Sequence, residues 1–378
     1  MNQMRKMKLP FCVLLAPNAF KGNLTALEVC QILSQELRQE GLHPISLPMG
    51  DGGDGTAEII AHYLQAYPIE IDAVDALGRP KRIIYYRNTE TAIIELAESC
   101  GIKDLKRDEY DVLNANTEGF GYAIEHAFQE GIRQFILCVG GSASIDGGLG
   151  ALIQMGLVVE RQDEKYRNQL IDLYCIKTDY LQEKYRDCTF TILCDVENPI
   201  CGKQGAAAIF GPQKGASASH IKLLDDQLQL FTHLLEQQTG LDLFSLKYGG
   251  AAGGIALTFH ALLKAQLLSG ANYCLALSNF TQRLASCFAV VTGEGKIDEQ
   301  SLYGKIPGTI AQICRQNKTF VYAITGKADS TLEQTFEQIF QITSYASSFE
   351  DSFQNAKSYL KWIAHDLADV LYDRYYSE

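Results

Sequence analysis

Residues 11–48 read FCVLLAPNAFKGNLTALEVCQILSQELRQEGLHPISLP, and this stretch decides the fold class. The short apolar run Phe11–Ala16 predicts a buried strand, whereas Leu24–Glu40 has the periodicity of an amphipathic helix, with Asn23 as its N-cap. A second strand and a second helix are predicted at His43–Pro48 and Thr56–Gln65. This β–α–β–α order is typical of a parallel sheet with helices packed on it.

The pattern changes in the middle of the chain and returns near its C-terminal end. Three short strand-like segments, Ile69–Asp75, Arg82–Arg87 and Thr91–Leu96, leave no room for crossover helices, so we expect them to pair antiparallel. With 378 residues, the chain is long enough for two domains. We therefore expect an α/β protein in which a mixed α/β domain is inserted into a parallel one. The expected boundaries are 1–70 plus 288–378 for the parallel domain and 71–287 for the inserted domain.

Composition argues against several classes of protein. The net charge of −12 disfavours nucleic acid or an anionic membrane surface as a partner, because both need a basic face. No window approaches the roughly 18 apolar residues of a membrane span, and the apolar run after the basic start is too short for a signal peptide. The eleven cysteines form no CxxC pair, which favours buried, reduced thiols. We expect a soluble, cytoplasmic protein and leave homo-oligomerisation open.

Five loops combine glycine with aspartate, asparagine, serine or lysine, and each follows a predicted strand. In open α/β sheets, ligands bind at the carboxyl ends of the strands, so these loops are the candidate site. They occupy residues 16–23, 50–56, 140–148, 194–215 and 292–307. Lys21 precedes a predicted helix N-terminus, where an anion is favoured. Asp51 lies among glycines that allow a ligand to approach the backbone, and its carboxylate suits magnesium.

The loop Gly140–Gly148 is the strongest candidate for binding nucleotide phosphates. Successive backbone N–H groups in such a loop can form a nest for phosphate oxygens. The chain lacks the GxxxxGK[ST] loop and the HRD and DFG motifs of protein kinases. Histidines form no HxxxH pair and no GxSxG elbow occurs, so a zinc centre and a serine hydrolase are disfavoured. Positioned cations and carboxylates are what phosphoryl transfer needs.

Taken in order, these loops resemble the motifs of the bacterial glycerate kinase family often called type I. The matching segments, spread over almost the whole chain, are Pro17–Gly22, Asp51–Thr56, Gly140–Gly148, Cys194–Pro199, Phe210–Ala216, Gly250–Gly254 and Thr292–Asp298. This chain departs from the family pattern at several positions, among them Ala19 in place of Ser. Asn18 replaces Asp, Asp54 replaces Glu, and Lys296 replaces an Arg whose fork would bind an anion with two hydrogen bonds.

The resemblance implies ATP as co-substrate, Mg²⁺, and D-glycerate as the acceptor. It also implies a flavodoxin-like parallel domain and an inserted domain that resembles a restriction-endonuclease fold. We expect the loops to line one cleft between the domains. The 2-hydroxyl is the acceptor position that the resemblance favours.

Roles are assigned to the loop residues on this basis. We expect the ATP phosphates to be held by Gly140, Gly141, Ser142, Asp146, Gly147 and Lys214. The residues expected to bind the substrate are Lys21, Asp51, Asn198, Glu294 and Lys296. The expected catalytic residues are Lys21, Asp195 and Asp298, and the expected magnesium ligands are Asp51, Asp195 and Asp298. Which of Asp195 and Asp298 orients the accepting hydroxyl and which holds magnesium is left open.

Three alternatives are kept beside the glycerate 2-kinase interpretation. The same loops suit a glycerate 3-kinase, a magnesium-dependent phosphatase or a non-catalytic sensor of a small acid. The chain lacks the DxDx[TV] motif of the common haloacid-dehalogenase phosphatases. A sensor rarely needs so many charged side chains withdrawn from water.

Overall fold

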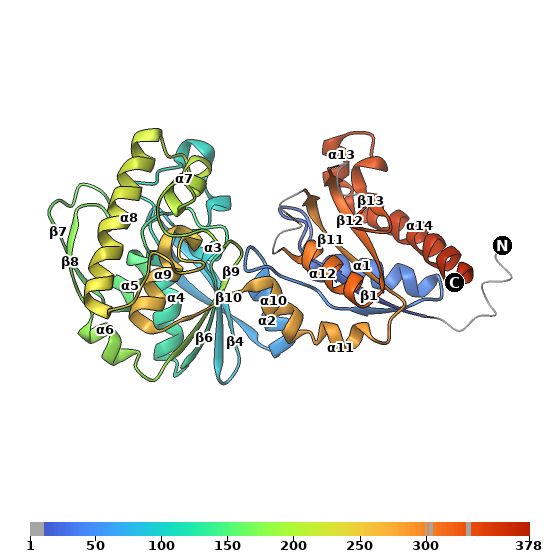
Figure 1. The fold of residues 1–378 in the computed structure, drawn as a ribbon, viewed down its shortest axis with the longest axis horizontal. Coiled ribbons are helices and arrows are strands. Elements are labelled where there is room, and N and C mark those ends of the chain that lie inside the picture. Colours follow the sequence, from blue (N-terminus) through green and yellow to red (C-terminus); the bar gives the residue numbers. More distant parts are fainter. Residues whose placement is uncertain (1–10, 299–300, 302–304, 330–333) are drawn as a thin grey trace. The chain divides into compact units, whose positions relative to one another are not determined.

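The computed structural model describes residues 11–298, 301, 305–329 and 334–378. Its internal contacts divide the chain into a first unit, Met1–Asp51 with Ala271–Glu378, and a second unit, Gly52–Gly270 (Figure 1). These limits differ from the predicted boundaries at residues 70 and 288. Residues after Asp51 belong to the second unit because helix α2 (Thr56–Leu64) packs against strands of that unit.

The first unit contains a five-stranded sheet in which all neighbouring strands are parallel. Its order is β13-β12-β11-β1-β2, so the strands run 2-1-3-4-5 when numbered along this unit. The strands are β1 (Cys12–Pro17), β2 (His43–Ser46), β11 (Ala289–Ile297), β12 (Phe320–Ala328) and β13 (Ile339–Gln341). The helices are α1 (Ala26–Gln39), α10 (Gly270–Leu277), α11 (Phe280–Leu284), α12 (Ile306–Gln316), α13 (Phe349–Gln354) and α14 (Ala356–Ser377).

One core of the first unit lies between this sheet and the paired helices α1 and α14 (Figure 1). Leu15 of β1, Leu33 of α1 and Leu367 of α14 are buried in it. Helix α1 begins at Thr25 rather than at the predicted cap Asn23, because Thr25 and Glu28 form a reciprocal capping box. The amide of Asn23 instead donates a hydrogen bond to the carbonyl oxygen of Phe353, at 2.7 Å.

The second unit has a six-stranded mixed sheet of order β10-β9-β6-β5-β4-β3. The four strands β10, β9, β6 and β5 are parallel, whereas β3 and β4 are antiparallel additions. The antiparallel pairing predicted for the middle of the chain is thus confirmed. The strands of this six-stranded sheet are β3 (Tyr67–Val74), β4 (Pro80–Arg87), β5 (Thr91–Glu95), β6 (Gln134–Cys138), β9 (Thr189–Cys194) and β10 (Gln266–Ser269).

Helices and one hairpin complete the second unit. The helices besides α2 are α3 (Leu96–Cys100), α4 (Glu118–Gln129), α5 (Leu149–Met155), α6 (Asp179–Lys184), α7 (Ala206–Phe210), α8 (Ala218–Thr239) and α9 (Ile255–Leu263). A separate antiparallel hairpin pairs β7 (Val158–Arg161) with β8 (Leu173–Lys177). The sequence analysis did not predict this hairpin or β10, because short, half-exposed strands give a weak periodic signal.

Two further observations bear on the expectations from composition. No described helix is both long enough and apolar enough to span a membrane. Cys12 and Cys287 lie close enough in the structure to pair as a disulfide, whereas the expectation from the sequence was reduced thiols. The two residues meet because β1 and β11 are neighbours in the sheet, which the sequence spacing alone does not reveal.

Candidate active site

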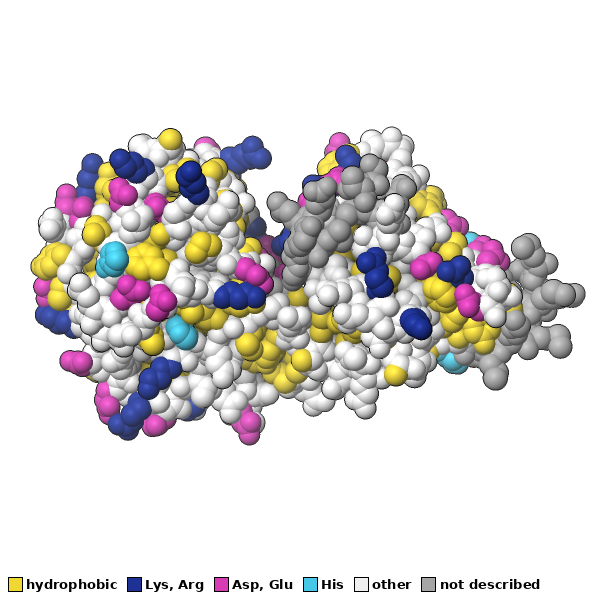
Figure 2. Space-filling model, in the orientation of Figure 1, with side chains coloured by type: hydrophobic (Ala, Val, Ile, Leu, Met, Phe, Trp, Pro, Cys, Tyr) yellow, Lys and Arg dark blue, Asp and Glu magenta, His cyan; other side chains and the backbone are white. Residues whose placement is uncertain are grey.

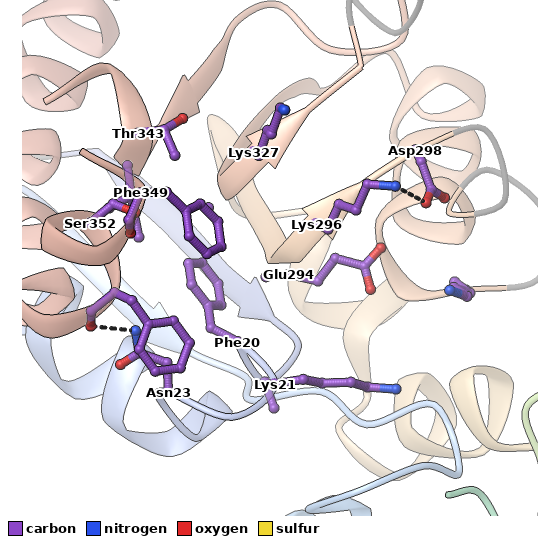
Figure 3. Close-up of a pocket in the computed structure, with 16 residues that line it drawn as sticks. Phe20, Lys21, Asn23, Glu294, Lys296, Asp298, Lys327, Thr343, Phe349 and Ser352 are labelled. Carbon is purple, nitrogen blue, oxygen red and sulfur yellow. Dashed lines mark hydrogen bonds and ion pairs between the residues drawn. The ribbon is translucent and has the colours of Figure 1, made fainter. Parts of the chain in front are cut away.

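The first unit has a cavity of about 430 Å³ at the carboxyl ends of β1, β11 and β12 (Figure 3). Four predicted site residues, Lys21, Glu294, Lys296 and Asp298, line it together. The loop that carries Lys21 is tied to β11, because the amide N–H of Asn18 donates to the carbonyl oxygen of Gly293 at 2.8 Å. Parallel pairing of β1 with β11 therefore brings residues far apart in sequence to one edge of the sheet.

Two more lysines line the same cavity, Lys305 and Lys327. Lys305 precedes α12 and Lys327 lies near the end of β12. The sequence places Lys305 in the candidate loop 292–307 without giving it a role, and it does not predict Lys327. The signal for Lys327 is weak: a Gly-Lys pair after an apolar run has no distinctive spacing.

Glu294 is the most deeply buried charged side chain that lines this cavity, at 6% exposure. Its Oε1 atom has no hydrogen-bond partner among the described residues. Burial raises the pKa of this carboxyl, while a hydrogen bond with Ser301 and the charge of Lys305 oppose the rise. A buried carboxylate oxygen without a donor is expensive unless a cation or a hydroxyl group supplies one. The cavity thus contains a strong acceptor that is ready for a ligand.

The other two predicted site carboxylates of the first unit, Asp298 and Asp51, accept hydrogen bonds from residues of the same unit. Asp298 accepts a charged hydrogen bond from Lys296 at 2.9 Å, and this contact lowers the pKa of Asp298. Asp51 is buried and accepts from the side-chain amide of Asn18 at 3.1 Å. An aspartate at position 18 would place a second carboxylate against Asp51, so Asn18 removes a like-charge contact.

The glycine loop of the second unit packs backbone to backbone against the loop that precedes α2. The amide N–H of Gly140 donates to the carbonyl oxygen of Gly52 at 3.0 Å. A Cβ atom at Gly140 would lie 2.5 Å from the Cα of Gly53, so no side chain fits there. Gly141 has φ of 76° and needs glycine for its backbone conformation.

We expect Gly140→Ala to force these two loops apart. The clash is with backbone, so the cost should be about 1–3 kcal/mol in the free energy of unfolding, together with a loss of the kinase activity that the family resemblance implies. Urea denaturation and a steady-state assay would measure both. Gly131→Ala is the control for activity: its φ of 89° makes alanine costly for stability there too, but a Cβ meets nothing within 4 Å and displaces no loop. Unchanged activity of Gly140→Ala would show that the loop contact is dispensable.

Asp146 stabilises the conformation of the glycine loop through hydrogen bonds. It is fully buried, and its oxygens accept hydrogen bonds from five donors, among them the backbone N–H and hydroxyl of Thr117 and the hydroxyl of Ser144. The amide of Gly147, another predicted site residue, donates to the carbonyl oxygen of Gly253 at 3.0 Å. Both residues are therefore engaged within the protein, and they would support phosphate binding through the shape of the loop.

Lys214 is buried beneath this loop at 4% exposure. Its Nζ atom donates to the hydroxyl of Ser142 at 2.8 Å and to the carbonyl oxygen of Ser144 at 2.6 Å. Burial lowers the pKa of Lys214 to about 8, although Asp146 and Asp195 oppose the shift. A cavity of about 90 Å³ is lined by Gly140, Gly141, Ser142, Asp195 and Lys214. This volume suits a single anionic group.

Asn198 does not line that cavity. Its side-chain amide donates to the carbonyl oxygen of Gln204 at 2.9 Å, and its own carbonyl oxygen accepts from the amide of Gly250. The bond with Gly250 joins two of the motif segments within the second unit. In the structure, Asn198 stabilises a loop beside the site.

Glu95 is a buried carboxylate that the sequence analysis missed. It lies at the end of β5, where it accepts from the backbone N–H groups of Gly55 and Ala57 at 2.9–3.1 Å and so caps the start of α2. Burial raises the pKa of Glu95 to about 7. An acidic residue that ends an apolar strand was the only signal in the sequence.

The raised pKa of Glu95 predicts a pH dependence of stability. The folded-state pKa of about 7 exceeds the ordinary value of 4.5, so this group stabilises the fold below pH 4.5 and loses that contribution as pH rises through 7. We expect Glu95→Gln to flatten this decline. Urea midpoints measured from pH 5 to pH 8 would test it, with Glu90→Gln, an exposed residue, as the control. Parallel pH profiles for Glu95→Gln and the wild type would contradict the prediction.

The described residues contain no group of three His, Cys, Asp or Glu side chains arranged to hold a metal ion. Of the three predicted magnesium ligands, Asp51 and Asp298 belong to the first unit and Asp195 to the second. Magnesium usually binds proteins through one or two carboxylates plus substrate phosphates. The unpartnered Oε1 of Glu294 therefore fits a cation that arrives with a phosphate-bearing ligand.

Comparison with known proteins agrees with these features. A model of the glycerate kinase family matches residues 13–372. The glycerate kinase of Halalkalibacterium halodurans is 32% identical over 322 residues, which cover 83% of this chain and 85% of that protein. The glycerate 2-kinase of Escherichia coli K12 is 31% identical over 322 residues, covering 83% and 84%. The crystal structure of a candidate glycerate kinase 2 from Salmonella typhimurium LT2 matches with a TM-score of 0.81 and 30% identity, over 96% of this chain and 99% of that one. The chain therefore belongs to the glycerate kinase family, whose members are ATP-dependent kinases.

Proposed function

We propose that the protein transfers the γ-phosphoryl group of ATP to the 2-hydroxyl of D-glycerate and releases ADP and 2-phosphoglycerate. The observation that carries this proposal is the cavity of the first unit, which four lysines line together with Glu294, a buried carboxylate with one unpartnered oxygen, at the carboxyl ends of parallel strands. Phosphoryl transfer depends on such positioned charges more than on covalent chemistry. The name of the Escherichia coli relative, glycerate 2-kinase, supports the choice of hydroxyl.

Each unit offers groups for one part of this reaction. The lysines of the first unit would neutralise phosphate or carboxylate charge, and Glu294 would accept the proton of the attacking hydroxyl or orient it. In the second unit, Ser142, Asp195 and Lys214 line one small cavity, where the ammonium group of Lys214 would bind an anionic group. The allocation of ATP phosphates to this loop and of glycerate to Lys21 and Lys296 remains a prediction.

Magnesium belongs to the same proposal. When bound, Mg²⁺ neutralises the β- and γ-phosphate oxygens. Glu294 and Asp298 supply carboxylate oxygens in the cavity of the first unit that could hold it, and the unpartnered Oε1 of Glu294 supports that role. Asp51 and Asp195 remain candidate ligands.

The finer fold assignments are also proposals. The strand order 2-1-3-4-5 supports a flavodoxin-like fold for the first unit. The mixed six-stranded sheet is compatible with the proposed restriction-endonuclease-like fold of the second unit. Acidic and basic side chains are interspersed over the face drawn in Figure 2, which supports a small-molecule substrate rather than nucleic acid. A cytoplasmic location rests on composition alone.

One experiment tests the reaction. The protein is incubated with ATP, Mg²⁺ and D-glycerate, ADP release is followed by a coupled assay, and the product is identified by phosphorus NMR. Glycerate-dependent ADP release with 2-phosphoglycerate as product supports the proposal. Formation of 3-phosphoglycerate would establish a glycerate 3-kinase, and glycerate binding without ADP release would indicate a sensor.

A further inference from the structure

The cavity of the first unit is larger and more apolar on one side than a three-carbon acid requires. Its volume of about 430 Å³ lies in the range of sites that take drug-sized ligands. The cavity beside Lys214, with about 90 Å³, is far smaller. A nucleoside triphosphate is larger than glycerate. The larger of these two cavities, in the first unit, is therefore the better fit for the nucleotide.

One wall of this cavity is aromatic. Phe349 and Phe353, both on α13, line it and are 73% and 47% exposed, and the buried Phe20 contributes to the same lining. In the close-up, the rings of Phe349 and Phe20 lie next to each other in this wall (Figure 3). Large exposed phenyl rings are costly beside a cavity unless a ligand covers them, and the flat faces of nucleobases stack on such rings.

Hydrogen bonds hold the aromatic wall in place. The amide of Asn23 donates to the carbonyl oxygen of Phe353 at 2.7 Å, which joins α13 to the loop after β1. Asp351 accepts from the hydroxyl groups of Ser347 and Tyr359, both at 2.8 Å, and from the amide of Asn355 at 2.7 Å. The wall is therefore formed before a ligand arrives, which lowers the entropic cost of binding.

The opposite side of the cavity is cationic. Four lysines line it against two carboxylates, Glu294 and Asp298. Neither Lys305 nor Lys327 forms an ion pair with any residue that the structure describes. Such an excess of ammonium groups suits a chain of phosphates better than the single carboxylate of glycerate.

From these features we propose that the cavity of the first unit is the nucleoside triphosphate site. The base lies against Phe349 and Phe353, and the phosphates extend toward Lys305 and Lys327. The proposal rests on the kinase function proposed above and names the unit that binds its nucleotide. It reverses the sequence-based allocation, in which the glycine loop of the second unit binds the ATP phosphates.

The test is a pair of exposed aromatic substitutions in the first unit. Phe349→Ala should raise KM for ATP about tenfold, equivalent to about 1.4 kcal/mol, and leave KM for D-glycerate within about twofold. Phe349→Tyr should leave KM for ATP close to the wild-type value, because tyrosine keeps the aromatic ring. Trp362→Ala, which removes a ring that is 57% exposed and does not line the cavity, should leave both constants unchanged.

Calorimetric titration with the non-hydrolysable analogue AMP-PNP in the absence of glycerate separates this proposal from the proposed function. Weaker binding to Phe349→Ala but not to Trp362→Ala supports a nucleotide site, even if the protein fails to phosphorylate glycerate. A rise in KM for glycerate alone, or unchanged nucleotide binding by Phe349→Ala, would overturn the assignment.

Discussion

Replacing Lys214 by methionine should lower kcat/KM by about a hundredfold or more, a loss on the order of 3 kcal/mol in transition-state stabilisation. The side chain is 4% exposed, lines the small cavity and donates to Ser142 and Ser144. Little solvent screens its charge, so the ammonium acts strongly on an anion bound beside it. Methionine keeps the length of the side chain and removes the charge.

The pH profile gives this prediction a second readout. Burial lowers the pKa of Lys214 from an ordinary 10.5 to about 8, so the wild-type enzyme should lose activity as pH rises through 8. The same shift makes its contribution to stability increase between pH 8 and pH 10.5, because the unfolded chain then holds the extra proton. A loss of activity above pH 8 would therefore not result from destabilisation of the fold by deprotonation of Lys214.

Lys222→Met is the matched control for Lys214→Met. Lys222 is exposed on α8, so its removal should change neither kcat/KM nor the pH profile. Thermal melts would verify that both variants are folded. A Lys214→Met enzyme with near-normal turnover and an unchanged alkaline decline would exclude the role proposed for this ammonium.

Glu294→Gln is the second substitution for which we expect a large effect, a fall in kcat of about a hundredfold. The change is isosteric but removes the charge of a side chain that is 6% exposed and whose Oε1 has no partner among the described residues. An uncharged amide neither accepts a proton nor binds Mg²⁺ strongly, so both roles proposed for Glu294 would be lost.

The stability of Glu294→Gln, unlike its kcat, should not fall at pH 8. Burial raises the pKa of Glu294, so its contribution to folding is present at low pH and is lost as pH rises through the folded-state pKa. At pH 8, Glu294→Gln should therefore melt at the same temperature as the wild type or higher. Glu350→Gln, an exposed change on α13, is the control for both measurements. Near-wild-type kcat in Glu294→Gln would rule out a direct role in the reaction.

The alternation of strands and helices was readable from the sequence because it depends on local periodicity. The predicted strand at Phe11–Ala16 differs from β1 by one residue at each end, and the predicted strand at His43–Pro48 extends two residues beyond β2. The loops after these strands were found for the same reason, since a strand that ends in glycine and polar residues marks a turn. The grouping of Lys21 with Glu294 also followed, because the carboxyl ends of parallel strands share one edge of a sheet.

The tertiary structure decided what these residues contact. Asp146 reads as a ligand-binding aspartate in the sequence, yet its oxygens are occupied by donors such as Thr117, 29 positions away. Lys327 has only a weak sequence signal and Phe349 has none. They join the cavity because β12 pairs with β11 and because the hydrogen bond from Asn23 to Phe353 ties α13 to the loop after β1. Sequence patterns report local conformation and strand ends, whereas burial, pKa shifts and cavity walls arise from contacts between distant segments. The sequence by itself thus determined the α/β architecture and the family-specific loops. The fold decided which charges face a ligand.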